Sequence, residues 1–196
     1  MFHSSLLYGA DSSVRTAAVR AYVAFVCDNE ENDAVIRQLS DLVPAVIKVC
    51  QHVVDTEDDD GGLEVMVSIC ESSNIMRKKG ALYLPPLIQQ CLQLMTELDD
   101  ELDEWLQMDD AEDELEEETA TIGETSLDRI ACALGGKAVM NHALQCINEL
   151  LNNENWKCRH AGLCALSTIG EGCKRQMEPL IPDIVNNFVL PKMADP

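Results

Sequence analysis

The chain has 196 residues and a formal net charge of −21, from 35 acidic and 14 basic residues. Such a balance disfavours nucleic acid as a partner, because phosphate binding needs clustered Lys and Arg, and it favours a basic partner. No apolar run approaches the length of a membrane span, so we expect no membrane insertion.

Helical spacing dominates the N-terminal third of the chain. Residues of N-cap type precede an apolar face at every third and fourth position, which predicts a helix over 11–28. A second helical segment covers 33–54, but Pro44 is tolerated only in the first turn of a helix. We therefore expect a short helix or turn up to Ser40 and a new helix from Leu42.

Two more helices precede the middle of the chain. After a polar loop over 55–62, helical spacing resumes over 63–72. Pro85 and Pro86 then begin the clearest amphipathic helix, which we expect to run straight into an acidic stretch. Its apolar face comprises Leu84, Leu87, Ile88, Cys91, Leu92, Met95 and Leu98.

The chain from Glu97 to Glu118 is strongly acidic: 14 of these 22 residues are Asp or Glu, and none is basic. Blocks of like charge repel themselves and usually stay unpacked, so we expect a flexible loop. One interpretation is a solvated linker, and the other is a surface that attracts a basic partner. Trp105 is either the last core residue of the preceding helix or a partner contact. The candidate contact residues are Asp103, Glu104, Trp105, Asp109, Asp110, Glu112, Asp113 and Glu114.

Helical pairs follow the acidic stretch. Residues 125–128 resemble a capping box, which predicts a helix that ends at Gly135-Gly136. Its partner covers 138–151, with Ala143, Cys146, Ile147 and Leu150 on one face.

A turn over 152–155 precedes a helix over 155–169, and Pro182 opens the last helix. No segment has the two-residue period of a strand, so the predicted fold class is all-α.

The helices form pairs that resemble one another. The second helices share an entry of apolar residues followed by proline, at Pro44, Pro85 and Pro182. Pro44 and Pro85 are 41 residues apart (85 − 44), the period of HEAT-type repeats. In such repeats a polar residue caps the first helix, as at Asn155, and an arginine such as Arg159 reaches toward the neighbouring repeat. The alternative is a helical bundle with coincidental similarity.

No catalytic or metal-binding pattern stands out. The nine cysteines are odd in number, lie mostly at apolar positions and follow no signal peptide, so we expect free thiols in a reducing compartment, the cytosol or nucleus. The four histidines lack finger spacing with cysteine, and no nucleophile elbow or phosphate loop is present. We expect no enzyme activity, no metal and no cofactor.

Two stretches carry a specific resemblance: Gly123–Lys137, with GETSLDRIAC and LGGK, and Asn155–Cys173, with NWKCRHAGL and ALSTIGEGC. They resemble the importin-β (karyopherin-β) superfamily, nearest to its importin-5 or Ran-binding protein 5 branch. Members of that family carry an acidic loop between the two helices of a central repeat, and the acidic run here lies in the corresponding place. Family members are several times longer, so the chain looks like a central HEAT-repeat fragment. About one repeat also looks absent near 58–62.

The resemblance implies a superhelical solenoid with three parts: HEAT-type pairs over 1–98, an acidic flexible loop over 99–123, and HEAT-type pairs over 124–196. It implies a nuclear import receptor of the cytoplasm and nucleus, without catalysis. Its partners would be basic import-signal cargo on the concave face lined by second helices, the GTP form of the Ran GTPase, and nucleoporins. The alternative function is a HEAT-repeat scaffold or adaptor, with the acidic loop as a solubilising linker.

Overall fold

The structure, a computed structural model, describes residues 61–72, 84–98 and 119–194, together with residues 21, 24, 25, 28, 29, 32 and 34. Within these ranges every regular element is a helix and no strand occurs, which confirms the all-α prediction. None of the helices described is long and apolar enough to cross a membrane. Of the expected helix over 33–54 only residue 34 is described. Residues 58–60 of the junction lie outside the described residues, whereas Gly61 and Gly62 are the first residues of a helix.

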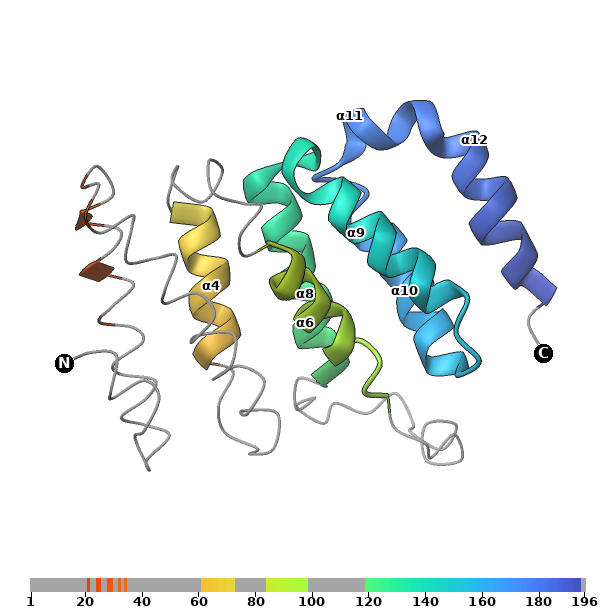
Figure 1. Cartoon of the computed structure of the whole chain (residues 1–196), viewed down its shortest axis with the longest axis horizontal. Coiled ribbons are helices and arrows are strands. Elements are labelled where there is room, and N and C mark those ends of the chain that lie inside the picture. Colours follow the sequence, from red (N-terminus) through yellow and green to blue (C-terminus); the bar gives the residue numbers. More distant parts are fainter. Residues whose placement is uncertain are drawn as a thin grey trace, which may run out of the picture.

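The helices lie in two rows (Figure 1). The first row comprises α4 (Gly61–Ser72), α8 (Thr119–Leu134) and α10 (Trp156–Thr168), in which α8 contacts both neighbours. The second row comprises α6 (Leu84–Leu94), α9 (Gly136–Leu151) and a C-terminal segment over 174–194. Each first-row helix from α8 onward packs against second-row helices, so one continuous core runs between the rows.

Helix α4 follows the predicted pattern. Leu63, Met66, Val67 and Cys70 are all buried, with at most 5% of their surface exposed. These positions repeat at three and four residues, so they fall on one face of the helix. The helix begins at Gly61, two residues before the range expected from the sequence.

Helix α6 confirms the predicted apolar face but not the predicted length. It ends at Leu94, so it does not run straight into the acidic stretch. The amides of Thr96 and Glu97 bond to carbonyls three residues back, at 3.0 Å, and the Thr96 hydroxyl also donates to the Gln93 carbonyl. Bonds of this spacing tighten and end the last turn. Leu98 therefore lies outside the helix.

Helix α8 begins at Thr119, which corrects two expectations. Residues 119–123, assigned above to the flexible loop, are helical. Residues 125–128 lie inside the helix, where Ser126 is buried, so they do not form a capping box. The physical reason is packing: a Cβ at Gly123 would lie 2.5 Å from the Cys91 carbonyl oxygen of α6. This close approach holds the first turns of α8 against α6.

The turn between α8 and α9 depends on Gly135. Its φ is 78°, a backbone conformation that favours glycine, and it ends α8 as predicted. The buried face of α9 is rotated from the expected one. Ala143 and Ile147 are buried as expected, but Cys146 and Leu150 are only half-buried. The core positions are instead completed by Val139, Met140 and Leu151.

Helix α10 begins as the repeat pattern predicts. The Asn155 side chain accepts a hydrogen bond from the Lys157 amide at 3.0 Å, which caps the helix. Arg159 donates to the carbonyls of Asn153 and Glu154, at 3.1 and 2.7 Å, and so stabilises the preceding turn.

The C-terminal segment is less regular than expected. It comprises α11 (Lys174–Met177), a 3₁₀ turn, α12 (Ile181–Ile184), a π-helical turn over Val185–Val189 and a final 3₁₀ turn over Leu190–Ala194. Pro182 lies in the first turn of α12, as predicted. Ile184 is buried and Phe188 half-buried, whereas Val185 and Val189 are exposed.

The seven described cysteines are all free, as predicted. Cys70, Cys91 and Cys173 are buried, and burial raises the pKa of Cys70 to about 12 and that of Cys173 to about 11. Cys132 is exposed, which departs from the expected apolar environment. The remaining three, Cys146, Cys158 and Cys164, are half-buried.

One ion pair joins neighbouring helices of the first row. Arg129 on α8 donates two hydrogen bonds to the Glu71 carboxylate on α4, at 2.9 and 2.7 Å. The hydrogen bond from Arg129 lowers the pKa of Glu71. A bidentate ion pair of this kind fixes the relative orientation of α4 and α8 better than a single hydrogen bond would.

Gly172 should tolerate no side chain. A Cβ there would collide with the Ala131 backbone of α8, so we expect Gly172→Ala to reduce the free energy of unfolding by about 1–3 kcal/mol. Gly162→Ala is the control: the atoms nearest its Cβ would be side-chain atoms of Leu150 and Leu151 at 3.0–3.3 Å, and alanine favours the helix. Urea unfolding of both variants measures the difference. Equal effects would contradict the close approach at Gly172.

The Glu71–Arg129 pair should contribute to stability in a pH-dependent way. Because the folded-state pKa of Glu71 lies below its unfolded value, the contribution is full at neutral pH and is lost as the pH falls below about 4. The pair is partly exposed, so we expect Glu71→Gln to cost only about 0.5–1 kcal/mol at pH 7. Unfolding of wild type and variant at pH 7 and pH 3 measures this. If the difference in unfolding free energy between wild type and Glu71→Gln were the same at pH 7 and pH 3, the stabilising role of the Glu71–Arg129 pair would be contradicted.

Candidate partner-binding site

All eight acidic-loop residues predicted to contact a partner lie within 99–118, outside the described residues. The structure does define both ends of this acidic segment (residues 99–118). It begins after Leu98, just beyond α6, and it ends immediately before Thr119, the first residue of α8. With α6 as a second helix, as its prolines indicate, and α8 as a first helix, the acidic segment joins one helical pair to the next. It does not join the two helices of one repeat, as the resemblance implied.

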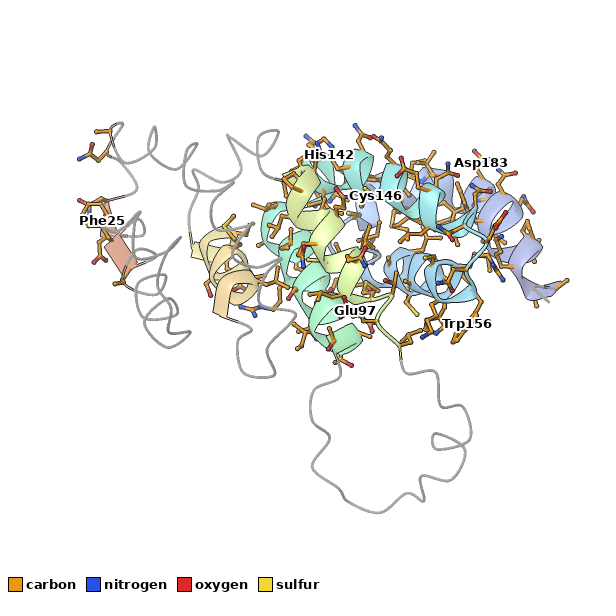
Figure 2. All side chains as sticks on the ribbon, turned by 60° about the horizontal axis from the view of Figure 1, so that its bottom comes forward. Phe25, Glu97, His142, Cys146, Trp156 and Asp183 are labelled. Carbon is orange, nitrogen blue, oxygen red and sulfur yellow. The ribbon has the colours of Figure 1, made fainter. Side chains whose placement is uncertain are left out.

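The start of the acidic segment is bound to α10. The Lys157 ammonium donates to the Leu98 carbonyl at 2.6 Å, in a partly buried position. Figure 2 shows Glu97 and Trp156 along the same edge of the molecule. This bond brings together the end of α6 and the start of α10, two elements that are far apart in sequence.

Trp156 lies at this edge and is 46% exposed. Its indole contacts the His160 ring edge-on, with centroids 6.4 Å apart and an interplanar angle of 77°. The sequence analysis named Trp156 only as part of the family resemblance. Its exposure was not evident there, because tryptophan at the start of a helix is compatible with the core as well as with the surface.

A groove of about 380 Å³ lies between the second-row helices α6 and α9. Most of its lining side chains end in an amide, imidazole or carboxylate, and none is Lys or Arg. The lining residues are Pro85, Gln89, Leu92, Gln93, His142, Gln145, Cys146, Glu149, Leu150 and Asn153. Figure 2 shows His142 and Cys146, which both come from α9.

The groove suits a cationic group. Glu149 supplies a carboxylate, and the side-chain oxygens of Gln89, Gln93 and Gln145 are hydrogen-bond acceptors for an ammonium or guanidinium group. Burial, followed by the Glu149 charge, raises the pKa of Cys146, so its thiol is neutral at physiological pH. The groove therefore provides a negative, hydrogen-bonding surface along the second row.

Sequence reasoning placed a partner on the second helices but did not identify the polar residues of this groove. Their only signal is that they occupy the polar positions between the apolar residues of α6 and α9. The rotation of α9, which leaves Cys146 and Leu150 in the groove wall, has no counterpart in the sequence pattern.

A second groove, also of about 380 Å³, lies between the first-row helices α8 and α10. It is lined by Glu124, Thr125, Asp128, Ser167, Thr168 and Glu171. Beside it, ligand atoms of Asp128, Cys132 and Glu171 lie within 4.8 Å of one another. Burial and the two carboxylates raise the pKa of Cys132.

Comparison with known proteins places these features in a family. Residues 54–141 match a family model described as an importin repeat, and residues 1–79 match one described as IPO5-like TPR repeats.

The chain is 30% identical over 164 residues to importin subunit beta-3 of Saccharomyces cerevisiae, an alignment that covers 80% of this chain and 15% of that protein. It is 32% identical over 124 residues to a probable importin-5 homolog of Dictyostelium discoideum, which covers 63% of this chain and 11% of that protein. The chain thus spans only a small part of these relatives.

Solved structures of Kap121p share the fold. The whole chain aligns with 23% of Kap121p bound to Nup53p, at a TM-score of 0.59 and 24% identity. It aligns with 24% of Kap121p bound to RanGTP at a TM-score of 0.59 and 23% identity, and with 23% of a Kap121p mutant at 0.66 and 24% identity. This likeness confirms the HEAT-repeat solenoid predicted from the sequence. The chain therefore belongs to the importin-β superfamily, and its two rows of helices are a run of that superfamily's HEAT repeats.

Proposed function

We propose that the chain is part of a nuclear transport receptor that binds basic import-signal cargo and the GTP form of Ran. Nucleoporins are its further partners, and it works in both cytoplasm and nucleus. Its action is binding without catalysis. The observation that carries this proposal is the negative, hydrogen-bonding groove between α6 and α9, one end of which lies beside the start of the acidic segment.

The groove and the acidic segment favour the same kind of partner at different ranges. The 14 acids between Glu97 and Glu118 create a field that attracts cations over roughly a Debye length, about 8 Å at physiological salt. At contact distance, Glu149 and the glutamine amides of the groove can receive individual ammonium or guanidinium groups. A lysine-rich or arginine-rich segment would therefore first be attracted by the acidic segment and then bind in the groove.

The relatives support a transport role. Kap121p, whose fold the chain shares, has been solved in complex with RanGTP, Nup53p and Ste12p. It has also been solved with the C-terminus of the phosphatase Cdc14p and with the SUMO protease Ulp1p. The matched relatives in Saccharomyces and Dictyostelium are named as importins.

A HEAT-repeat scaffold with the acidic segment as a solubilising linker is the competing function. The two functions differ in their response to Ran. A scaffold is indifferent to the nucleotide state of Ran, whereas a transport receptor releases its basic partner when Ran carries GTP. Competition by Ran-GTP against a bound lysine-rich peptide, compared with Ran-GDP, separates them.

Neutralising part of the acidic segment should slow association with a basic partner. We expect Glu112→Gln, Asp113→Asn and Glu114→Gln together to lower the association rate of a lysine-rich import-signal peptide by about threefold at low salt, with a smaller effect at high salt. Stopped-flow measurement at several salt concentrations tests this. The control replaces one aspartate and two glutamates elsewhere (Glu171→Gln, Glu178→Gln and Asp183→Asn), all exposed. Equal slowing by both triple variants would show that only net charge matters.

Reversing the charge of the groove should weaken equilibrium binding of the same peptide. We expect Glu149→Lys to reduce affinity by about tenfold, because it places a cation where the peptide's cation would lie. Glu171→Lys makes the same charge change in the first-row groove and should have a much smaller effect. Titration calorimetry compares the two. A larger loss for Glu171→Lys would move the binding site to the first row.

A further inference from the structure

Two histidines of the chain stand four residues before a cysteine within a helix. They are His142, before Cys146 on α9, and His160, before Cys164 on α10. Residues four apart lie on the same face of a helix, and two zinc ligands at this spacing can bind one ion. The expectation of no metal rested on the absence of finger spacing, and helical spacing is a second way to bring zinc ligands together.

The pair on α10 is already in contact. The Cys164 sulfur lies 3.8 Å from each ring nitrogen of His160. In a tetrahedral site with Zn–N of about 2.1 Å and Zn–S of about 2.3 Å, the nitrogen and the sulfur are about 3.6 Å apart. The observed separation is close to this value, so small rotations of the two side chains would let both bind one ion.

The His160 ring also has an aromatic neighbour one turn earlier. The Trp156 indole meets it at an interplanar angle of 77°, with the ring centroids 6.4 Å apart. Neighbouring groups that restrict the orientation of a ligand raise its affinity for metal. His160 is nevertheless exposed, so an ion can reach its nitrogens from solvent.

A third ligand comes from the neighbouring helix α8. The Thr168 hydroxyl lies 3.2 Å from a Glu124 carboxylate oxygen and 2.9 Å from the Cys164 carbonyl oxygen, so the carboxylate lies beside the last turn of α10. Burial, followed by the Glu124 charge, raises the pKa of Cys164. Imidazole, thiolate and carboxylate are the three side-chain ligand types of zinc in proteins.

The cluster of Asp128, Cys132 and Glu171 is a competing set, because its ligand atoms lie within 4.8 Å of one another. Carboxylates favour magnesium, calcium and manganese, whereas thiolates and imidazoles favour zinc. Two carboxylates with one thiol combine opposing preferences and include no imidazole. The set that contains His160 therefore suits zinc better.

We propose that His160, Cys164 and Glu124 bind a zinc ion between α8 and α10, with water as the fourth ligand. On binding, the Cys164 thiol releases its proton to solvent and its sulfur forms the Zn–S bond. One thiolate and one carboxylate then balance the two positive charges of the ion. The ion joins two neighbouring helices of the first row, so it stabilises their packing. This site goes beyond the proposed function and does not depend on it.

The experiment titrates the full 196-residue chain, kept reduced with a phosphine, with Zn²⁺ alone and with Co²⁺ alone. Cobalt bound to a thiolate gives a charge-transfer absorption that cobalt bound only to nitrogen and oxygen lacks. We expect this absorption in wild type and its loss when excess zinc displaces the cobalt. Zinc at about ten times its dissociation constant should raise the thermal midpoint by about 3–6 °C.

Single substitutions assign the ligands. Cys164→Ser should remove the cobalt–thiolate absorption, and both Cys164→Ser and His160→Gln should lower zinc affinity by at least about tenfold, since even partners outside the ligand set contribute that much. Glu124→Gln should cause a smaller loss, because an amide oxygen remains. The matched controls are Cys146→Ser and His142→Gln, in a pair with the same spacing for which the structure shows no such contact. Both controls should leave the absorption and the thermal shift unchanged.

Three results would overturn the proposal. The cobalt–thiolate absorption could persist in Cys164→Ser and disappear in Cys132→Ser, which would move the metal to the competing cluster. Equal losses in Cys164→Ser and Cys146→Ser would show thiol binding without a built site. The third is a thermal midpoint of wild type that zinc leaves unchanged. Peptide binding is not measured in this experiment, so none of these results affects the proposed function.

Discussion

The packing of α8 against its neighbours is the constraint on which the rest of the structure depends. This helix contacts α4 and α10 in its own row and α6 and α9 in the other, so it lies at the centre of the described helices. Leu127, Ile130 and Ala131 are completely buried along it. Backbone approaches at Gly123 and Gly172 leave no room for a Cβ, which fixes α8 relative to α6 and to the turn after α10. HEAT pairs cannot bury their faces alone, and α8 is the element through which the pairs share a core.

The position of α8 also determines where the acidic segment can lie. Gly123, five residues after the end of that segment, lies against Cys91, Leu94 and Met95 near the end of α6. The two ends of the segment are therefore held close together while both flanking helices bury their apolar faces. Carboxylates without paired cations cannot enter such a core, because burying an isolated charge is far too costly. A long acidic insertion is compatible with the solenoid because the helices on both sides of it pack without requiring any of its carboxylates in the core.

The two rows of helices carry different features. The first row carries the Glu71–Arg129 ion pair and the glycine contact at Gly172, which join neighbouring pairs. The second row carries the groove of amides and a carboxylate between α6 and α9. Lys157, in the first row, donates to the Leu98 carbonyl after α6 in the second row, so this bond joins the two rows just before the acidic segment begins.

The sequence by itself determined the helices, their pairing and the family. The apolar faces of α4 and α6, the glycine stop at Gly135 and the Asn155 cap depend on interactions within a few residues, and local patterns predicted them correctly. The sequence also showed the charge of the acidic segment. Only the tertiary structure decided that α8 begins at Thr119, that α6 ends before the first acid, and that α9 is rotated. It alone placed Gln93 and Asn153 in the lining of one groove and brought Lys157 to Leu98. These features arise where distant segments pack together, and a periodic pattern specifies which face of a helix is buried but not which neighbour buries it.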